Sequence, residues 1–281
     1  MSFILAESGG SKTDWYDHRT QKHYRTAGLH PFLTTPAQRQ DSLKSLPFDP
    51  LPRAVFFYGA GCGQALGQRV IQDELRQYFG ATFIQVQSDL MAAAHATAGD
   101  SSGIVAILGT GSHAGRFDGQ HFTQQAYNLG YLLGDEASGA DFGKQLLRAY
   151  AYGELPLHLH RAWEARFGAI SRDQILTALY RQDNPNRFLA GFAPFLFDHS
   201  EEQFCQDMLQ SRLRLFAERH LHPLQAREKI LPVHVVGGLM QASSLARALT
   251  DLLNTYGWSV GVFCPYPLER LIAYHTKKPP P

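Results

Sequence analysis

Two short segments of the sequence carry the residue types that hold phosphate groups, and each follows an apolar run. Residues 8–13 read SGGSKT, and residues 108–113 read LGTGSH. Glycines leave the backbone N–H groups of a turn open to a ligand, and hydroxyl and lysine side chains add further donors. One such turn is weak support, because Gly-Gly-Ser is also ordinary turn sequence. Two of them, one in each half of the chain, could hold a polyphosphate from both sides.

A third glycine turn is a further candidate for nucleotide binding, and two known phosphate-binding motifs do not fit the sequence. Gly237 and Gly238 end a buried apolar strand and precede a predicted helix, whose N-terminal N–H groups could approach a nucleotide. The sequence has no G-x-x-x-x-G-K-[ST] segment, which excludes a standard P-loop. The segment GAGCGQALG at residues 59–67 lacks the spacing of a dinucleotide-binding turn.

The elements that must position these turns alternate between strands and helices. In the first hundred residues we expect strands at 3–7, 13–18, 22–28, 53–59 and 81–87, and helices at 36–46, after residue 63 and at 90–98. Thr35 and Pro36 suit the cap and the first position of the first helix. The second half repeats the plan, with strand–turn–strand at 103–117 and strand–Gly-Gly–helix at 231–253. The pattern predicts a duplicated α/β fold with domains at residues 1–102 and 103–281.

Composition excludes several classes of function. Of the 281 residues, 44% are hydrophobic and 18% charged, which is typical of a globular protein, and the net charge of +1 gives no electrostatic case for a nucleic-acid partner. No apolar run is long enough to span a membrane, and the N-terminus does not read as a secretion signal. Three scattered cysteines argue against a disulfide framework or a zinc site. We therefore expect a cytoplasmic protein with neither a membrane nor a nucleic acid as partner.

Seven motifs in a fixed order resemble those of a known family. They read ESGGSKTDW, GAG, SDLMAAAHA, LGTGS, GYLLGDEASG, VVGG and PLERLIAYH. The chain resembles the sugar kinases of the actin, heat-shock-protein and hexokinase superfamily, and more narrowly the N-acetylglucosamine kinases and the BadF/BadG-type ATPases. This resemblance implies two duplicated ribonuclease H-like (actin-like ATPase) domains that face a central cleft. It also implies that a C-terminal helix at residues 266–276 packs back on the first domain.

The resemblance implies a role for particular residues. The residues matched to ATP phosphates and the adenosine side are Gly9, Gly10, Ser11, Lys12, Thr13, Gly109, Thr110, Gly111, Ser112, Gly237 and Gly238. Asp89 matches the catalytic base, which accepts the proton of the attacking sugar hydroxyl. From its place after a strand alone, Asp89 would be read as a helix N-cap. Asp135 is expected to bind sugar hydroxyls, whereas Glu136 suits the acidic first turn of a helix.

Three residues depart from the pattern of the family. Glu7 stands where an Asp usually helps to hold Mg²⁺, often through water. His113 follows the second turn, and His30 follows the third strand, where the family usually has Asn on the sugar side. Neutral imidazole offers one donor and one acceptor in a geometry different from that of an amide. The two histidines are therefore candidates for substrate binding, with either altered sugar recognition or lost activity as the consequence.

The function that the resemblance implies is an ATP- and Mg²⁺-dependent kinase that acts on N-acetylglucosamine or a related amino sugar. Two alternatives remain at this point. One is a sugar-binding homologue with an altered or inactive kinase site. The other is a BadF-type ATPase that activates a partner enzyme, although the cysteine positions do not suggest the iron–sulfur cluster of those proteins. The resemblance leaves open whether the chain forms a homodimer.

Overall fold

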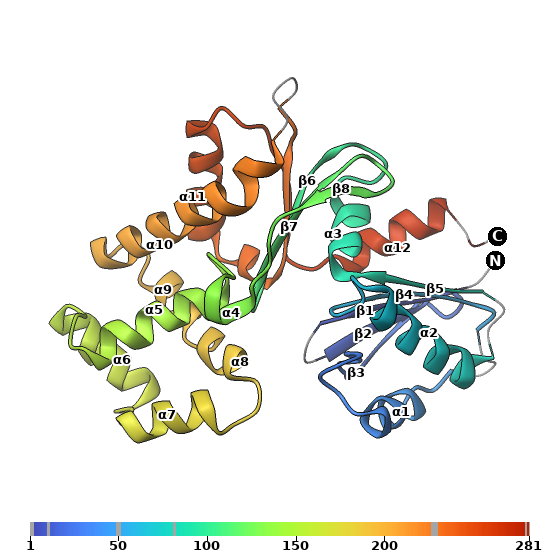
Figure 1. The fold of residues 1–281 in the computed structure, drawn as a ribbon, viewed down its shortest axis with the longest axis horizontal. Helices are drawn as coiled ribbons and strands as arrows, with labels where there is room; N and C mark the ends of the chain where they lie inside the picture. The colour runs from blue at the N-terminus through green and yellow to red at the C-terminus, as the bar shows by residue number, and fades with distance from the viewer. Residues whose placement is uncertain are drawn as a thin grey trace. The chain divides into compact units, whose positions relative to one another are not determined.

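The structure is a computed structural model, and it describes residues 3–9, 12–48, 52–80, 83–225, 230–278 and 280. The chain divides into two compact units, and Figure 1 labels most of their helices and strands. The first unit consists of residues 1–100 together with residues 266–281, and the second consists of residues 101–265. The boundary that the sequence predicts, between residues 102 and 103, lies slightly further along the chain.

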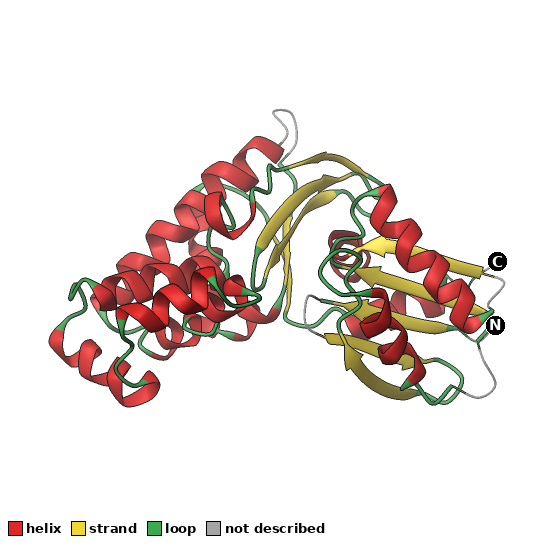
Figure 2. Cartoon of the chain, turned by 60° about the horizontal axis from the view of Figure 1, so that its bottom comes forward, coloured by secondary structure: helices red, strands yellow, loops and turns green. Residues whose placement is uncertain are grey.

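The first unit is built on a five-stranded mixed sheet with helices on both faces (Figure 2). Across the sheet, its strands are β3 (Lys22–Ala27), β2 (Lys12–Asp17), β1 (Ile4–Ser8), β4 (Ala54–Gly59) and β5 (Phe83–Ser88). β2 is antiparallel to both β1 and β3, whereas β1, β4 and β5 run parallel. The three parallel strands therefore end at the same edge of the sheet, and the segments that follow them meet there.

The strand β4 lies between two hydrophobic layers, and all six of its residues are buried. The helices of this unit are α1 (Pro36–Lys44), α2 (Ala65–Phe79), α3 (Asp89–Thr97) and α12 (Leu268–Lys277). Val55 and Phe57 share a core with α1 and α2 on one face. Phe56 and Tyr58 pack with α3 and α12 on the other face, where these two helices lie against each other. An uninterrupted apolar run is the sequence signature of a strand covered on both faces.

The second unit repeats this topology. Across its sheet, the strands are β10 (Val260–Cys264), β9 (Val233–Val236), β6 (Gly103–Leu108), β7 (Ser112–Phe117) and β8 (Phe122–Gln125). β7 is antiparallel to β6 and β8, whereas β6, β9 and β10 run parallel. β6 and β7 thus correspond to β1 and β2, and β9 corresponds to β4. The duplicated α/β fold that the sequence predicts is confirmed.

Helices make up most of the second unit outside its sheet (Figure 1). They are α4 (Gly130–Leu133), α5 (Gly139–Ala151), α6 (Leu157–Phe167), α7 (Arg172–Tyr180), α8 (Pro185–Ala190), α9 (Ala193–Asp198), α10 (Gln203–Phe216) and α11 (Ser243–Thr255). The α10 helix continues into a π turn (Ala217–Leu221) and a short 3₁₀ turn (His222–Leu224). The buried ring of Trp163 packs against Phe167, Phe192 and Phe195, so these helices share one apolar core.

The first helix begins where its local sequence predicts. The helix α1 begins at Pro36 after the N-cap Thr35. The Thr35 hydroxyl accepts a hydrogen bond from the Gln38 N–H, and the Gln38 side chain accepts one from the Thr35 N–H. This reciprocal pair satisfies two N–H groups that the helix itself leaves without partners.

Two predictions about helix starts in the second unit are wrong. The helix α5 begins only at Gly139, with Ser138 as its N-cap, so Glu136 lies before the helix instead of in its first turn. After the strand β9, Gly238 begins a 3₁₀ turn (Gly238–Gln241), and α11 starts only at Ser243. The N-terminus of a regular helix therefore does not directly follow the Gly-Gly pair.

Two further findings concern membrane spans and cysteines. None of the helices in the described part of the chain is long and apolar enough to cross a membrane. Cys62, Cys205 and Cys264 are all described and buried, and none takes part in a disulfide. Burial raises the pKa of the Cys62 thiol to about 12 and that of Cys205 to about 11, so both stay protonated at neutral pH.

Candidate active site

The carboxyl edge of the first sheet brings several predicted site residues together. Ser8, Gly59 and Ser88 lie side by side at the ends of β1, β4 and β5. Gly9 and Asp89 therefore follow at the same edge, although they are distant in the sequence. Parallel strands place the ends of separate sequence segments in this way, and ligands of α/β proteins commonly bind there.

Asp89 is the first residue of α3, and it is half-buried. The N-cap of this helix is Ser88, whose hydroxyl accepts a hydrogen bond from the Met91 N–H at 3.1 Å. One carboxylate oxygen of Asp89, Oδ1, lies 2.9 Å from the N–H of Leu90. The interpretation of Asp89 as a helix cap is therefore wrong, because Ser88 fills that role.

Glu7 is half-buried on β1 and has a strongly shifted pKa. Burial is the main cause that raises its pKa to about 7, and the negative charge of Asp89 is the second. Asp14, which lies opposite Glu7 in the β1–β2 hairpin, raises the pKa further, and Lys12 opposes these effects. The negative charges of Asp89 and Asp14 thus both act on the carboxyl group of Glu7 at this edge.

Lys12 lies on the same face of the hairpin as Glu7. Its Nζ is 2.9 Å from Oδ2 of Asp14, and it lies 5.9 Å from the centre of the Tyr266 ring. Burial alone would raise the pKa of Asp14, but hydrogen bonds from Lys12 and Arg25 outweigh it and lower that pKa. The Lys12 side chain is 43% exposed, so its ammonium group stays accessible to a ligand.

The hydroxyl groups of Ser8 and Thr13, on either side of the first turn, are hydrogen-bonded to each other. Both residues are fully buried, and Thr13 Oγ1 donates to Ser8 Oγ at 2.8 Å. The N–H of Leu29 donates to both hydroxyl oxygens, which ties the segment after β3 to the turn. The Thr13 hydroxyl is therefore hydrogen-bonded inside the protein, where it positions the turn, and its contact with phosphate stays a prediction.

Other residues of the first turn are only partly defined. Gly9 donates its N–H to the Lys12 carbonyl at 3.0 Å, which closes the hairpin. A Cβ atom on Gly9 would meet only this carbonyl, at 3.9 Å, so the backbone is open there. Gly10 and Ser11 lie outside the described residues.

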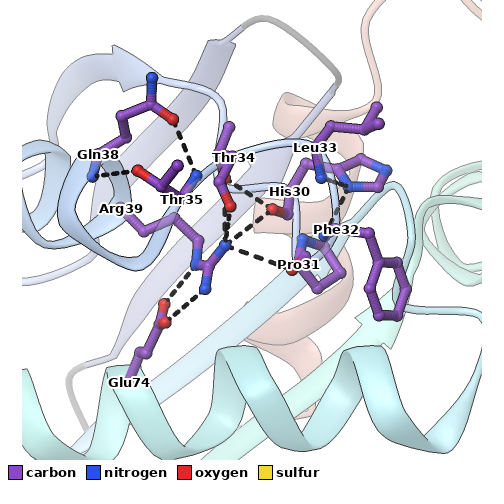
Figure 3. Close-up of polar contacts among 9 residues, drawn as sticks. All are labelled: His30, Pro31, Phe32, Leu33, Thr34, Thr35, Gln38, Arg39 and Glu74. Carbon is purple, nitrogen blue, oxygen red and sulfur yellow. Dashed lines mark hydrogen bonds and ion pairs between the residues drawn. The ribbon is translucent and has the colours of Figure 1, made fainter.

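His30 orders the segment after β3 through its imidazole ring (Figure 3). Its Nδ1 accepts hydrogen bonds from the N–H groups of Phe32 and Leu33, each at 3.1 Å. A nitrogen that accepts two N–H groups carries no proton, so the neutral ring has its proton on Nε2. Burial, aided by the nearby charge of Arg39, lowers the pKa of His30 and favours this neutral form.

A buried arginine holds the same segment from the other side (Figure 3). Arg39 forms a two-pronged ion pair with Glu74, in which both N···O distances are 2.7 Å. Its Nη1 donates to the carbonyls of His30 at 3.2 Å and of Pro31 at 3.3 Å, and also to the carbonyl of Thr34. Sequence reasoning missed this pair, because nothing in the sequence links Arg39 to a glutamate in a separate helix.

In the second unit, the turn between β6 and β7 is held in place by hydrogen bonds that its carbonyl groups accept. The N–H of Gly139 donates to the Gly109 carbonyl at 2.8 Å, and the N–H of Ala140 donates to the Thr110 carbonyl at 3.0 Å. Within the residues that the structure describes, the N–H groups of Thr110 and Gly111 have no partner. Adjacent N–H groups without protein partners at a turn are what an anion requires.

Asp135 lies against this turn, not apart from it. It is buried, and its Oδ1 accepts a hydrogen bond from the Ser112 N–H at 3.1 Å. A Cβ atom on Gly111 would lie 3.0 Å from Oδ2 of Asp135, so a side chain at this position would crowd the carboxylate. Burial raises the pKa of Asp135. The predicted sugar carboxylate and the predicted phosphate turn therefore form one local structure.

The two glycines after β9 differ in their surroundings. Gly237 has a φ of +137°, and a Cβ atom there would overlap the carbonyl of Leu108. Gly238 has only the Gln241 side chain near a Cβ position, at 3.8 Å. Gly237 is thus required for close packing against the second turn, and Gly238 leaves open space beside it.

The remaining sugar-side prediction concerns His113, in the strand β7. His113 is half-buried on β7 and lies opposite Ile107 of β6. Sequence reasoning did not single out Asn128, whose side-chain Nδ2 donates to the Ser112 carbonyl at 3.2 Å. Its Oδ1 accepts a hydrogen bond from the Gly130 N–H at 2.9 Å. The Asn-x-Gly spacing is a turn signal that could have drawn attention to this residue.

The fit of Mg²⁺ depends on Glu7 and its neighbours. Among the described residues, no group of three or more His, Cys, Asp or Glu side chains is arranged to hold a metal ion. Mg²⁺ usually keeps several waters and binds to only one or two carboxylates. Burial is the main cause of the raised pKa of Glu7, and a cation would relieve the smaller part that the charges of Asp89 and Asp14 cause. The residues therefore fit a Mg²⁺ ion held at Glu7, largely through water.

Solved structures resemble the whole chain. A candidate N-acetylglucosamine kinase from Porphyromonas gingivalis is 31% identical, and the match covers 98% of this chain and 99% of that one with a TM-score of 0.89. A candidate N-acetylglucosamine kinase from Chromobacterium violaceum is 20% identical over 97% and 98% of the two chains, with a TM-score of 0.71. A candidate N-acetylmannosamine kinase from Listeria monocytogenes is 12% identical over 99% of both chains, with a TM-score of 0.54. No protein-family model and no curated protein sequence matches the chain.

The α/β fold that the two units share is the actin-like ATPase fold. Within it, 31% identity over nearly the full length of both chains shows that this chain belongs to the N-acetylglucosamine kinase family. The family that the sequence motifs indicate is thereby confirmed.

Proposed function

We propose that the chain is an ATP-dependent kinase that phosphorylates a hydroxyl of N-acetylglucosamine or a related amino sugar. The observation that carries this proposal is the position of Asp89 at the start of α3, where Ser88 already serves as the cap. Its carboxylate lies at the sheet edge, where its negative charge raises the pKa of Glu7. The name of the 31% identical relative supports the same activity.

Asp89 serves as the general base in this proposal. Its carboxylate accepts the proton of the sugar hydroxyl while the hydroxyl oxygen attacks the γ-phosphate of ATP, and ADP leaves in line. In the second unit, the N–H groups of Thr110 and Gly111, which have no partner among the described residues, bind phosphate oxygens. In the first unit, the accessible ammonium of Lys12 does the same. No covalent enzyme intermediate is needed, because the sugar hydroxyl attacks directly.

Glu7 is the residue that would hold Mg²⁺, directly or through water. The ion would neutralise negative charge that develops on the transferred phosphoryl group. A glutamate reaches one methylene further than the aspartate usual in the family. The charges of Asp89 and Asp14 support binding of a cation there, because both repel an ionised Glu7 carboxylate.

His30 and Asp135 serve the sugar side of the proposed reaction. The Nε2–H of His30 is a single donor, fixed by the two hydrogen bonds at Nδ1. Asp135 uses Oδ1 for the Ser112 N–H, which leaves Oδ2 as an acceptor for a sugar hydroxyl. The predictions of a cytoplasmic location and of a homodimer remain predictions.

A turnover assay with a panel of sugars tests this proposal. The purified chain is given ATP and Mg²⁺, and ADP release is followed with N-acetylglucosamine, N-acetylmannosamine, glucosamine and glucose. We expect release that requires Mg²⁺ and is stimulated most by an acetylated amino sugar. Sugar binding detected by calorimetry without any turnover would instead identify a sugar-binding homologue. ADP release that no sugar stimulates would favour an ATPase.

A further inference from the structure

The loop that carries Asp135 has an unfavourable backbone. Asp135 and Ala137 both have a φ of +57°, in the left-handed region that residues with a Cβ atom rarely adopt. Neither is glycine, so the conformation must be imposed by surrounding contacts. Such residues cluster at functional sites because the contacts fix a side chain in a particular place.

Glu136, between these two residues, supplies the strongest of those contacts. Its side chain is only 5% exposed, and its two carboxylate oxygens have separate partners. Arg219 Nη1 donates to Oε1, and His220 Nε2 lies 2.7 Å from Oε2. Burial alone would raise the pKa of Glu136, but these two partners lower it, so the carboxylate is ionised at neutral pH.

The partners of Glu136 come from the π turn that follows α10. Arg219 and His220 are adjacent in this turn, and both reach one carboxylate. π turns interrupt regular helices and often occur at functional sites. His220 Nδ1 is buried without a partner among the described residues. A buried nitrogen without a partner lowers stability, which indicates that this ring is not placed for stability alone.

A second contact holds the other side of the loop. The N–H of Ala137 donates to Oδ2 of Asp141 at 3.0 Å, and Arg212 Nε donates to the same oxygen at 2.7 Å. Arg212 lies on α10, so this helix and its π turn hold the loop at Glu136 and, through Asp141, at Ala137. The remaining freedom of Asp135 is removed by its hydrogen bond with the Ser112 N–H.

We propose that Glu136, Arg219 and His220 form a positioning cluster that fixes Asp135 against the turn at residues 109–112. None of the three is a catalytic residue, because they act through Asp135. The kinetic consequence of this cluster, a change in the KM for sugar, rests on the kinase function proposed above. Its structural consequence, an ordered Asp135–Ser112 contact, does not depend on that function.

Arg219 offers the cleanest test, because its side chain is 58% exposed and its removal leaves the core intact. In Arg219→Met one carboxylate oxygen of Glu136 loses its partner, whereas Arg219→Lys keeps a positive donor. Arg166→Met is the matched control, since Arg166 forms an exposed ion pair with Asp198 in the same unit. A second variant, Glu136→Gln, must turn an NH₂ group toward Arg219 or His220, and Glu202→Gln in the exposed His158–Glu202 pair is its control.

Two readouts separate positioning from simple stability. Hydrogen exchange is measured in the segment 109–113, and the KM values for sugar and ATP are measured separately. In Arg219→Met we expect exchange in this segment to become about tenfold faster while exchange in the β9 core is unchanged. We also expect the sugar KM to rise about 10–100-fold and the ATP KM to change less, because small displacements in a site have effects of this size. Arg219→Lys should recover most of both losses.

Each outcome decides between the alternatives. Unchanged exchange at 109–113 and an unchanged sugar KM in Arg219→Met, together with a lower melting temperature, would show that the cluster contributes only stability. Faster exchange throughout the second unit would also show that the cluster contributes only stability. If the wild-type chain has no kinase activity, the proposed function fails, but local exchange in Arg219→Met still decides whether the cluster positions Asp135.

Discussion

Among single residues, Glu7 gives a prediction for the pH dependence of stability in the protein without metal. Its pKa of about 7 lies above the ordinary value of 4.5, so the folded state binds a proton more strongly than the unfolded state. Stability from this group is therefore present at low pH and is lost as pH rises from 4.5 through 7. A shift of this size corresponds to about 3 kcal/mol at alkaline pH, as an upper bound. Glu7→Gln should accordingly raise the melting temperature by a few degrees in EDTA at pH 8.

The same Glu7 variant should behave differently at low pH and with metal. At pH 5 Glu7 is protonated in the wild-type protein, so the stabilisation should disappear. Mg²⁺-dependent turnover should fall at every pH, because the amide is a poor ligand for Mg²⁺. Glu202→Gln, which changes an exposed glutamate, is the control. Equal melting temperatures for Glu7→Gln and the wild type at pH 8 would contradict the account of this cluster.

The two glycines after β9 give a second prediction for single residues. Gly237→Ala places a Cβ atom against the Leu108 carbonyl at a φ of +137°, and should lower the free energy of unfolding by about 3 kcal/mol or more. Gly238→Ala meets only the end of the Gln241 side chain and should fold like the wild type. Urea unfolding of both variants checks this. Equal destabilisation would refute the distinction between a packing glycine and an open one.

Among the elements, α12 is held to the first unit by a buried hydrogen-bonded group. The Tyr58 hydroxyl lies 2.7 Å from His95 Nδ1 on α3 and 2.8 Å from His275 Nε2 on α12. The His275 ring also stacks on Phe56, with 3.8 Å between ring centres. Burial is the main cause that lowers the pKa of His95 to about 4 and of His275 to about 3. Both rings are therefore neutral in the folded protein at physiological pH.

The neutral histidines make the docking of α12 sensitive to acid. Between pH 6.5 and about 4 the unfolded chain binds more protons at these residues than the folded chain, so stability falls as pH falls. Glu7 has the opposite effect in this range, so the measurement belongs in the Glu7→Gln background. Urea unfolding there should show a loss of stability from pH 7 to pH 5. No change over this range would contradict the proposed neutral network.

Helix starts show what local sequence can and cannot predict. Thr35 and Pro36 are adjacent to the helix that they begin, so α1 could be predicted from the sequence alone. The N-cap of α3 could not be predicted in this way, because Ser88 and Asp89 are both good caps and only the structure shows which one is used. Local sequence also places Glu136 in the first turn of a helix, whereas its partners in the structure, Arg219 and His220, lie far along the sequence.

For the whole molecule, the repeated pattern made the fold predictable. Strand–turn–strand and strand–glycine–helix units recur in both halves, and each recurs in the matching sheet. The contacts of the candidate site could be predicted less well. The contact of Asp135 with Gly111 and the positioning cluster around Glu136 join residues that share no periodicity. Such contacts depend on loop conformations that composition and spacing do not determine.

The most direct test of the central claim is transfer of the γ-phosphoryl group from ATP to N-acetylglucosamine, followed by ³¹P NMR for the wild type and Asp89→Asn. The account predicts a sugar phosphate that accumulates in step with ADP in the wild type. It also predicts a loss of at least about 100-fold in rate for Asp89→Asn, since a general base contributes 10²–10⁴-fold. Asp100→Asn, at an exposed position in the same unit, is the control. Undiminished transfer by Asp89→Asn, or ADP without any sugar phosphate in the wild type, would contradict the account.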